Sequence, residues 1–299
     1  MKKFMASIIA IGTALALSAC GTPESFGGGE LADSDTIVIG SQAYYSNEII
    51  AAAYAQALED AGYKVKRDFR IGQREVYIRD VESGEIDLFP EYTGPLLQYW
   101  HNDVSARESQ EVYEQLVAAA PAGVQVLDQS PATDQDSYVV SEQFSREYSL
   151  TSATDLKNVT VPLVLGANSE AESRPNGPQG LKNFYGVDVG FTPIEDSGGP
   201  LTVKALQDGQ VNIAILYTAD PSISENNLTV LSDPAHLFLA SHVVPIASDD
   251  LDQHAQEIIN KLSAALTLDV LLELNKRSIN DRLSAEEIAR DWVATLSLS

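Results

Sequence analysis

The sequence predicts an α/β protein with two lobes, and three observations lead to this fold class. Short β-branched runs alternate with runs of helical periodicity from residue 36 onward. A polar segment at residues 128–136 interrupts this alternation, and a second series of the same kind follows it. Three helical stretches then close the chain. Strands that alternate with helices favour α/β units built on a largely parallel sheet.

The first series begins with the β-branched run at residues 36–40, which a glycine ends as in a buried strand. The next run, 46–63, has apolar residues at helical spacing, with Ser46 or Asn47 as its cap and Gly62 at its end. Residues 64–71 then read as a strand, 74–84 as a helix and 85–89 as a strand. The run at 123–127 continues the same pattern.

The second series begins at residues 136–141 and is followed, after another strand-like run at 241–248, by the three closing helices. Its further segments are 159–166, 180–187, 190–194, 201–209, 211–216 and 228–232, and the helices are 252–265, 268–276 and 285–296. The chain would cross between lobes near 128–136 and 240–247. We therefore expect a discontinuous first lobe, 36–130 with 244–299, and a second lobe, 131–243, with a ligand cleft between them.

The N-terminus has the pattern of a bacterial lipoprotein signal. Lys2 and Lys3 precede an apolar run that is too short for a mature membrane span, and small residues precede Cys20. We expect residues 1–20 to be a signal peptide, with Cys20 lipidated as the first mature residue. Since Cys20 is the only cysteine, no disulfide can form within the chain. Residues 21–35, rich in Gly, Ser and acid, are typical of a flexible tether.

The chain is strongly acidic. It has 43 Asp and Glu against 19 Lys and Arg, a formal net charge of -24. Such a surface repels nucleic acid and attracts cations over long range, although solubility alone is an equally good reason for it. No histidine has a partner at metal-ligand spacing, and neither a nucleophile elbow nor a phosphate loop occurs. We expect no enzyme activity, no metal and no cofactor.

Four segments, taken in order, resemble the substrate-binding proteins of osmoprotectant ABC transporters, which bind glycine betaine, choline, carnitine and similar compounds. They are VIGSQAYYSNEIIAAAYAQALEDAGYKV, SGEIDLFPEYTG, LGANSEAESRPNGPQGLKNFYG and ALQDGQVNIAILYTAD. The second is the most specific match, and the likeness runs from about residue 36 to 296. It implies a type 2 periplasmic-binding-protein fold. Together with the lipoprotein signal at the N-terminus, we expect a protein that is lipid-anchored on the extracytoplasmic face of the cell membrane. The implied partners are a membrane permease and a small quaternary amine, and the protein would act as a monomer.

The resemblance also implies the binding residues. Tyr92 of PEYTG, Tyr44 of GSQAYYSNE and Tyr217 of LYTAD match three walls of an aromatic cage, with Asn47 within reach of the ligand. Arg174 of SRPNG matches the anchor of a ligand carboxylate. Aromatic faces suit a quaternary ammonium group because it carries a charge but no N–H to donate. A guanidinium fork suits a carboxylate. The alternative is that these are ordinary half-buried tyrosines and a surface arginine.

One segment departs from the family pattern. LFLASHVVP stands where the family has Phe-Phe-Pro-Pro-Tyr-Asn-x-x-Pro, so Ser241 replaces the fourth cage tyrosine and His242 replaces an asparagine. The loss of one aromatic face costs on the order of 1–2 kcal/mol. Tyr45 or His242 would then substitute for the missing wall, or His242 is a hinge residue with its hydrogen bonds satisfied.

Three functions are compatible with the sequence. The first is a binder of glycine betaine, proline betaine, choline or carnitine. The second keeps the importer role but takes a different ligand, such as ergothioneine or an aromatic compound, which the change at Ser241 and His242 favours. The third is a surface enzyme or sensor that uses the same fold, because fold does not fix function. The third requires an acid–base or metal constellation in the cleft, which the sequence does not supply.

Overall fold

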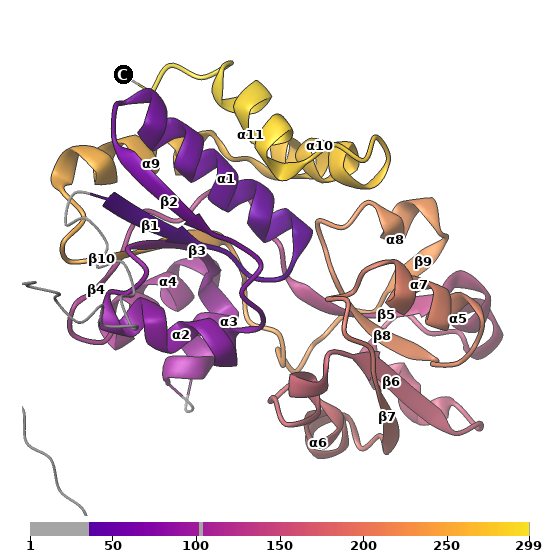
Figure 1. The fold of residues 1–299 in the computed structure, drawn as a ribbon. Coiled ribbons are helices and arrows are strands. Elements are labelled where there is room, and N and C mark those ends of the chain that lie inside the picture. Colours follow the sequence, from indigo (N-terminus) through magenta and orange to yellow (C-terminus); the bar gives the residue numbers. More distant parts are fainter. Residues whose placement is uncertain (1–35, 102–103, 299) are drawn as a thin grey trace, which may run out of the picture. The chain divides into compact units, whose positions relative to one another are not determined.

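The computed structural model describes residues 36–101 and 104–298, which belong to one compact unit beginning at Asp35. The predicted signal peptide, Cys20 and most of the predicted tether lie outside the described residues. Two five-stranded sheets organise the described part of the chain (Figure 1). We call each sheet with its covering helices a lobe. The limits predicted for the lobes from the sequence remain a prediction.

The first sheet has the strand order β2-β1-β3-β10-β4. Strands β1 and β2 pair in parallel, as do β1 and β3, whereas β10 runs antiparallel to both of its neighbours. Strands from before and after the segment that forms the second sheet therefore meet in one sheet. The strands are β1 (Thr36–Gly40), β2 (Lys64–Asp68), β3 (Leu88–Tyr92), β4 (Val124–Val126) and β10 (Val243–Ser248).

Helices cover both faces of this sheet (Figure 1). One apolar cluster joins one face to α1 and the C-terminal helices, and a second joins the other face to α2, α3 and α4. Helix α1 packs against α11, and the alanines of α1 are buried. The helices are α1 (Tyr45–Asp60), α2 (Arg74–Ser83), α3 (Thr93–Trp100), α4 (Ser109–Ala119), α9 (Gln253–Ala265), α10 (Leu268–Ile279) and α11 (Ala285–Val293).

The second sheet repeats the arrangement, with the order β7-β6-β8-β5-β9 and an antiparallel β5. Its strands are β5 (Asp136–Ser141), β6 (Leu163–Ala167), β7 (Val189–Pro193), β8 (Ile213–Tyr217) and β9 (Leu228–Val230). Short helices cover it: α5 (Glu142–Tyr148), α6 (Pro178–Gly180), α7 (Pro200–Gln207) and α8 (Ser222–Glu225). Two 3₁₀ turns, η1 (Ala153–Asn158) and η2 (Ser169–Glu172), and a π turn, η3 (Leu181–Tyr185), complete the lobe.

The predicted α/β fold class with two lobes is confirmed, and two details of the expectation are wrong. Each sheet is mixed rather than largely parallel, because β5 and β10 are the first strands after the two crossings and enter antiparallel to their neighbours. Neither Ser46 nor Asn47 caps α1. Tyr44 is the N-cap residue and makes no side-chain cap bond, while both predicted caps are buried within the first turn.

A buried ion pair fixes the junction between β3 and α3. Glu91, 1% exposed, accepts hydrogen bonds from Arg74 Nε (2.7 Å) and Nη2 (2.9 Å) and from the Tyr77 hydroxyl (2.6 Å). It also accepts from the N–H of Tyr92, at 2.8 Å. Four donors thus satisfy one carboxylate, which is the condition under which a buried charge is tolerated. The pair ties the start of α2 to Glu91, the residue before the last of β3.

Removing the charge from this pair is expected to destabilise the fold strongly. Glu91→Gln leaves the Arg74 guanidinium buried without its counter-charge, and we expect a loss of about 3–5 kcal/mol in the free energy of unfolding, measured by urea titration. Glu59→Gln is the matched control, because Glu59 makes a bidentate pair with Arg67 that is about one-third exposed. It should cost less than about 1 kcal/mol. Equal losses in the two variants would contradict this account.

Candidate functional site

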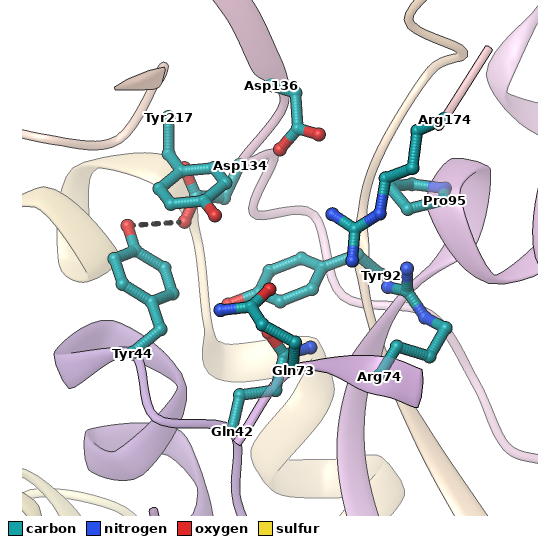
Figure 2. Close-up of a pocket in the computed structure, with 10 residues that line it drawn as sticks. All are labelled: Gln42, Tyr44, Gln73, Arg74, Tyr92, Pro95, Asp134, Asp136, Arg174 and Tyr217. Atoms are coloured by element: carbon teal, nitrogen blue, oxygen red, sulfur yellow. Dashed lines mark hydrogen bonds between the residues drawn. The ribbon is translucent and has the colours of Figure 1, made fainter. Parts of the chain in front are cut away.

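A pocket lies where the carboxyl ends of the parallel strands in the two sheets face each other, the usual place for a ligand in open α/β sheets. Tyr92 ends β3, Tyr217 ends β8, and Tyr44 follows the end of β1. Figure 2 shows the rings of Tyr44 and Tyr217 on one side, two arginines on the other and Tyr92 between them. The lining residues are Gln42, Tyr44, Gln73, Arg74, Tyr92, Pro95, Asp134, Asp136, Arg174 and Tyr217.

The aromatic rings form a cluster drawn from both lobes. The ring centroids of Tyr44 and Tyr217 are 4.4 Å apart at an interplanar angle of 42°. Tyr45 meets Tyr44 edge-on, with centroids 5.0 Å apart. Tyr44 and Tyr92 are 3% and 7% exposed. Burial raises the phenol pKa of Tyr44, Tyr92 and Tyr217, so all three stay neutral. These rings present apolar faces with a negative quadrupole to the pocket.

The Tyr92 hydroxyl is a buried polar group without a hydrogen-bond partner among the described residues. Leaving such a group unpaired costs about 1–3 kcal/mol. Buried groups in native structures are nearly always paired, so an exception calls for a functional explanation. Since Tyr92 lines the pocket, its hydroxyl is available to a bound molecule.

Asp134 brings a carboxyl group against the aromatic cluster. It accepts hydrogen bonds from the Tyr44 hydroxyl (3.1 Å, dashed in Figure 2) and from the N–H of Ala219 (3.0 Å). Burial and, to a smaller extent, the nearby charges of Asp220 and Asp136 raise the pKa of Asp134 to about 7, against the effect of these two bonds. The group therefore changes its charge near neutral pH.

Asp136 is the second carboxyl group of the pocket, and it is half-buried beside both arginines. Burial raises its pKa, whereas the guanidinium groups of Arg174 and Arg74 act in the opposite direction. Its one hydrogen bond among the described residues is a long one, from Asn176 Nδ2 at 3.5 Å. Asp136 thus retains most of its capacity to accept hydrogen bonds.

Arg174, the predicted carboxylate anchor, lines the pocket and is already bonded to a carboxylate of the other lobe. Its Nη2 donates to both oxygens of Glu75, at 3.1 and 3.0 Å, and its Nε donates to Oε1 at 3.3 Å. The side chain of Arg174 is 23% exposed and that of Glu75 is 40% exposed. The pair joins the segment just after η2, in the second lobe, to the first turn of α2, in the first lobe.

The space beside the rings is narrow. It amounts to about 20 Å³, which is roughly enough for one water molecule. A wider chamber of about 280 Å³ adjoins it and shares Arg74, Pro95, Asp136 and Arg174 with it. Both compartments therefore lie against the same two guanidinium groups and the same carboxyl group.

Four of the predicted site residues do not line this pocket. The Tyr45 hydroxyl donates to Asp220 Oδ2 at 3.1 Å. Asn47 accepts from the N–H of Gln42 (2.8 Å) and donates to the carbonyl of Pro90 (2.7 Å), so it holds the segments that follow β1 and precede Tyr92. The remaining two, Ser241 and His242, lie on the segment that leads into β10.

Ser241 and His242 have their hydrogen bonds satisfied within the crossing segments. The Ser241 hydroxyl donates to the carbonyl of Asp134 at 2.9 Å. His242 Nδ1 lies 2.8 Å from the carbonyl of Ser130, an arrangement in which the nitrogen donates, and its backbone N–H donates to Thr93 Oγ1 at 3.0 Å. Both residues therefore have partners within the protein, and the hinge role stays a prediction. Ligand contact by Ser241, His242, Tyr45 and Asn47 remains a prediction.

Sequence reasoning missed six lining residues: Gln42, Gln73, Arg74, Pro95, Asp134 and Asp136. Two of them, Asp134 and Asp136, belong to the polar segment that was recognised as a crossing between lobes. A crossing at the carboxyl edges of two sheets necessarily passes the cleft, and this was the available signal. Within the described residues, no helix is long and apolar enough to span a bilayer, and no acidic or histidine cluster has the arrangement of a metal site.

Comparisons with known proteins agree on one family. The model of the substrate binding domain of ABC-type glycine betaine transport systems matches residues 35–295. The carnitine transport binding protein OpuCC of Listeria monocytogenes is 27% identical over 290 residues, covering 92% of this chain and 90% of that protein. A Helicobacter pylori ergothioneine transport permease and binding protein, EgtU, is 23% identical over 265 residues, covering 86% of this chain and 46% of its own length.

The fold has solved counterparts as well. A crystal structure described as a glycine betaine/carnitine/choline ABC transporter superposes with a TM-score of 0.69 at 18% identity, covering 87% of this chain and 98% of that one. At this identity the likeness concerns the fold alone, and it identifies the two mixed sheets as those of a periplasmic binding protein. The family match spans both sheets and every residue of the pocket. The chain therefore belongs to the family of substrate-binding domains of ABC-type glycine betaine transport systems.

Proposed function

We propose that this protein binds glycine betaine or a related quaternary ammonium compound in an aromatic cage and delivers it to an ABC permease. One observation carries the choice of ligand class. Tyr44, Tyr92 and Tyr217 lie at or just after the ends of three separate strands, come from both lobes and line one pocket. The family to which the chain belongs serves ABC transport and is not a class of enzymes.

The chemistry of the pocket suits a quaternary ammonium group. Such a group carries a full charge but offers only methyl groups on its surface, so it cannot donate a hydrogen bond. It gains instead from neutral aromatic faces and from nearby negative charge. The three tyrosines are neutral because burial raises their pKa. Asp134 lines the pocket, accepts a hydrogen bond from the Tyr44 hydroxyl and, when ionised, supplies negative charge at the cage.

Binding requires the two lobes to part. The space at the rings is about 20 Å³ and the Tyr44 and Tyr217 centroids are 4.4 Å apart, whereas a quaternary ammonium group is larger than one water molecule. A ligand would enter an opened form and favour closure by contacting residues of both lobes at once. The closed form would then dock on the permease, with the protein acting as a monomer.

A different ligand within the same importer role is the second candidate. The H. pylori relative that is named for ergothioneine covers 86% of this chain. Ser241 stands where the family pattern has a fourth cage tyrosine. The smaller side chain would make room for a larger group on the ligand. Ergothioneine carries a trimethylammonium group too, so the three tyrosines would serve both candidates.

We also propose that Cys20 anchors the protein by lipid to the extracytoplasmic face of the cell membrane. The basic start, the short apolar run and the small residues before the lone cysteine support this. Cys20→Ser should release the protein from the membrane fraction into the medium or periplasm while ligand binding is retained. Fractionation of cells followed by immunoblotting measures this. Retention of Cys20→Ser in the membrane would count against the anchor.

Loss of one cage wall should weaken binding. Tyr92→Leu keeps the apolar volume but removes the quadrupole, and we expect the Kd for glycine betaine, choline or carnitine to rise roughly 2- to 30-fold in titration calorimetry. Tyr92→Phe keeps the ring and should lose much less, which separates the ring from its hydroxyl. If Tyr92→Leu binds as well as the wild type, Tyr92 is not a wall.

Affinity should also depend on pH through Asp134. Its pKa of about 7 leaves it mostly neutral at pH 6 and mostly ionised at pH 8. A cation prefers the ionised form, so affinity should rise with pH through 7 by at most about tenfold and then level off. Tyr44, Tyr45, Tyr92, Tyr217, Asp136 and Asp220 are the titratable groups that face it.

Calorimetry at pH 6, 7 and 8, with the quaternary ammonium ligand that binds best, measures this dependence. Asp134→Asn should flatten it. His242→Gln is the control, since His242 bonds to the carbonyl of Ser130 and does not line the pocket. It should keep the dependence. A dependence that survives Asp134→Asn would overturn the assignment to Asp134.

A further inference from the structure

The charges around the pocket are not balanced. Two guanidinium groups line it, and each is already in a bidentate pair with a glutamate: Arg74 with Glu91 and Arg174 with Glu75. Two carboxyl groups, Asp134 and Asp136, remain, and no ion pair within 4.0 Å involves either of them in the described part of the chain. A charge count over these six groups gives two negative charges in excess when both aspartates are ionised.

We propose that the site selects a ligand that is a cation without a carboxylate, a quaternary ammonium alcohol such as choline, and that Glu75 determines this selection. The inference rests on the proposed function and narrows it. Glu75 supplies to Arg174 the carboxylate that a betaine would otherwise supply. A zwitterion would have to displace Glu75, whereas a simple cation leaves the pair intact.

The hydrogen-bonding groups of the pocket favour an alcohol for the same reason. A carboxylate only accepts hydrogen bonds, and a hydroxyl both donates and accepts them. Asp136 has one long bond at 3.5 Å and retains free acceptor positions. A ligand O–H can donate to it, but a ligand carboxylate would meet it as a second acceptor of the same charge. The unpartnered hydroxyl of Tyr92, itself 7% exposed, is an independent sign of a polar group that a ligand completes.

Asp134 points to a net positive charge on the ligand. Burial disfavours its ionised form strongly enough to bring its pKa to about 7, so its charge is costly in the closed structure. A cation between the rings offsets this cost. A zwitterion brings an equal negative charge into the same enclosed space, next to Asp136, and offsets far less of it.

The test compares choline with glycine betaine in the wild type, Glu75→Gln and Glu59→Gln by calorimetry. We expect the wild type to bind choline at least about tenfold more tightly than glycine betaine, because bringing like charges together in a binding site strongly disfavours binding. Glu75→Gln frees Arg174, so betaine should bind more tightly, choline more weakly, and the ratio of the two Kd values should shift at least about tenfold toward betaine.

Glu59→Gln is the matched control. Glu59 also forms a bidentate pair with an arginine of the first lobe, at 2.5 and 2.8 Å, but does not line the pocket. It should leave the ratio unchanged. Asp136→Asn is a second variant that should shift the ratio in the same direction as Glu75→Gln. Urea unfolding of each variant establishes that it is folded before its affinities are compared.

The outcomes separate the inference from the proposed function. Glycine betaine bound as tightly as choline, or more tightly, by the wild type overturns the selection while the quaternary ammonium function stands. A ratio unchanged in folded Glu75→Gln overturns the role of Glu75. If neither compound, nor carnitine or ergothioneine, gives heat, both the inference and the proposed function fall.

Discussion

The buried pair of Arg74 and Glu91 is the interaction on which the geometry of the site depends. Glu91 directly precedes Tyr92 of the pocket wall, and Arg74 itself lines the pocket and directly precedes Glu75, which pairs with Arg174. The bidentate contact, at 2.7 and 2.9 Å, therefore fixes the backbone at two places at once. A pair that served stability alone could be replaced by apolar residues at little cost. Here the charges also set the position of the groups that line the pocket.

In the second lobe no buried ion pair occurs among the described residues, and strand register positions the pocket residues instead. Tyr217 ends β8, and Asp136 lies directly opposite it in the antiparallel pairing with β5. The aromatic ring and the carboxyl group therefore enter the pocket from the same rung of one ladder. Asp134, two residues earlier, lies on the crossing and bonds to Tyr44 of the first lobe. The pocket is thus assembled from strand ends whose register is fixed by the sheets.

The fold class could be predicted from periodicity, because strand ends are marked by changes in it. The three tyrosines of the pocket were predicted from motifs that resemble those of a family, since spacing alone does not distinguish them from half-buried core tyrosines. The pairing of Glu75 with Arg174 could not be predicted, since 99 residues separate them and only lobe closure brings them together. Asp134 and Asp136 could not be told from the other carboxylates in a chain with 43 of them. The antiparallel β5 and β10 depend on the direction of each crossing, which periodicity does not report.

Closure of the lobes depends on a balance between the hydrogen bonds that join the lobes and the charges that closure brings together. Hydrogen bonds of Tyr44 to Asp134, of Tyr45 to Asp220, of Gln73 to Ser197 and of Arg174 to Glu75 join the lobes. Against them, closure buries Asp134 near two other acids, which raises its pKa. Under the proposed function, a bound cation would offset this opposition, so the residues that attract the ligand would also make closure depend on it. A ligand shifts a two-state equilibrium only by its differential affinity for the two states. Here that difference would lie in the carboxyl groups that closure brings together around the rings.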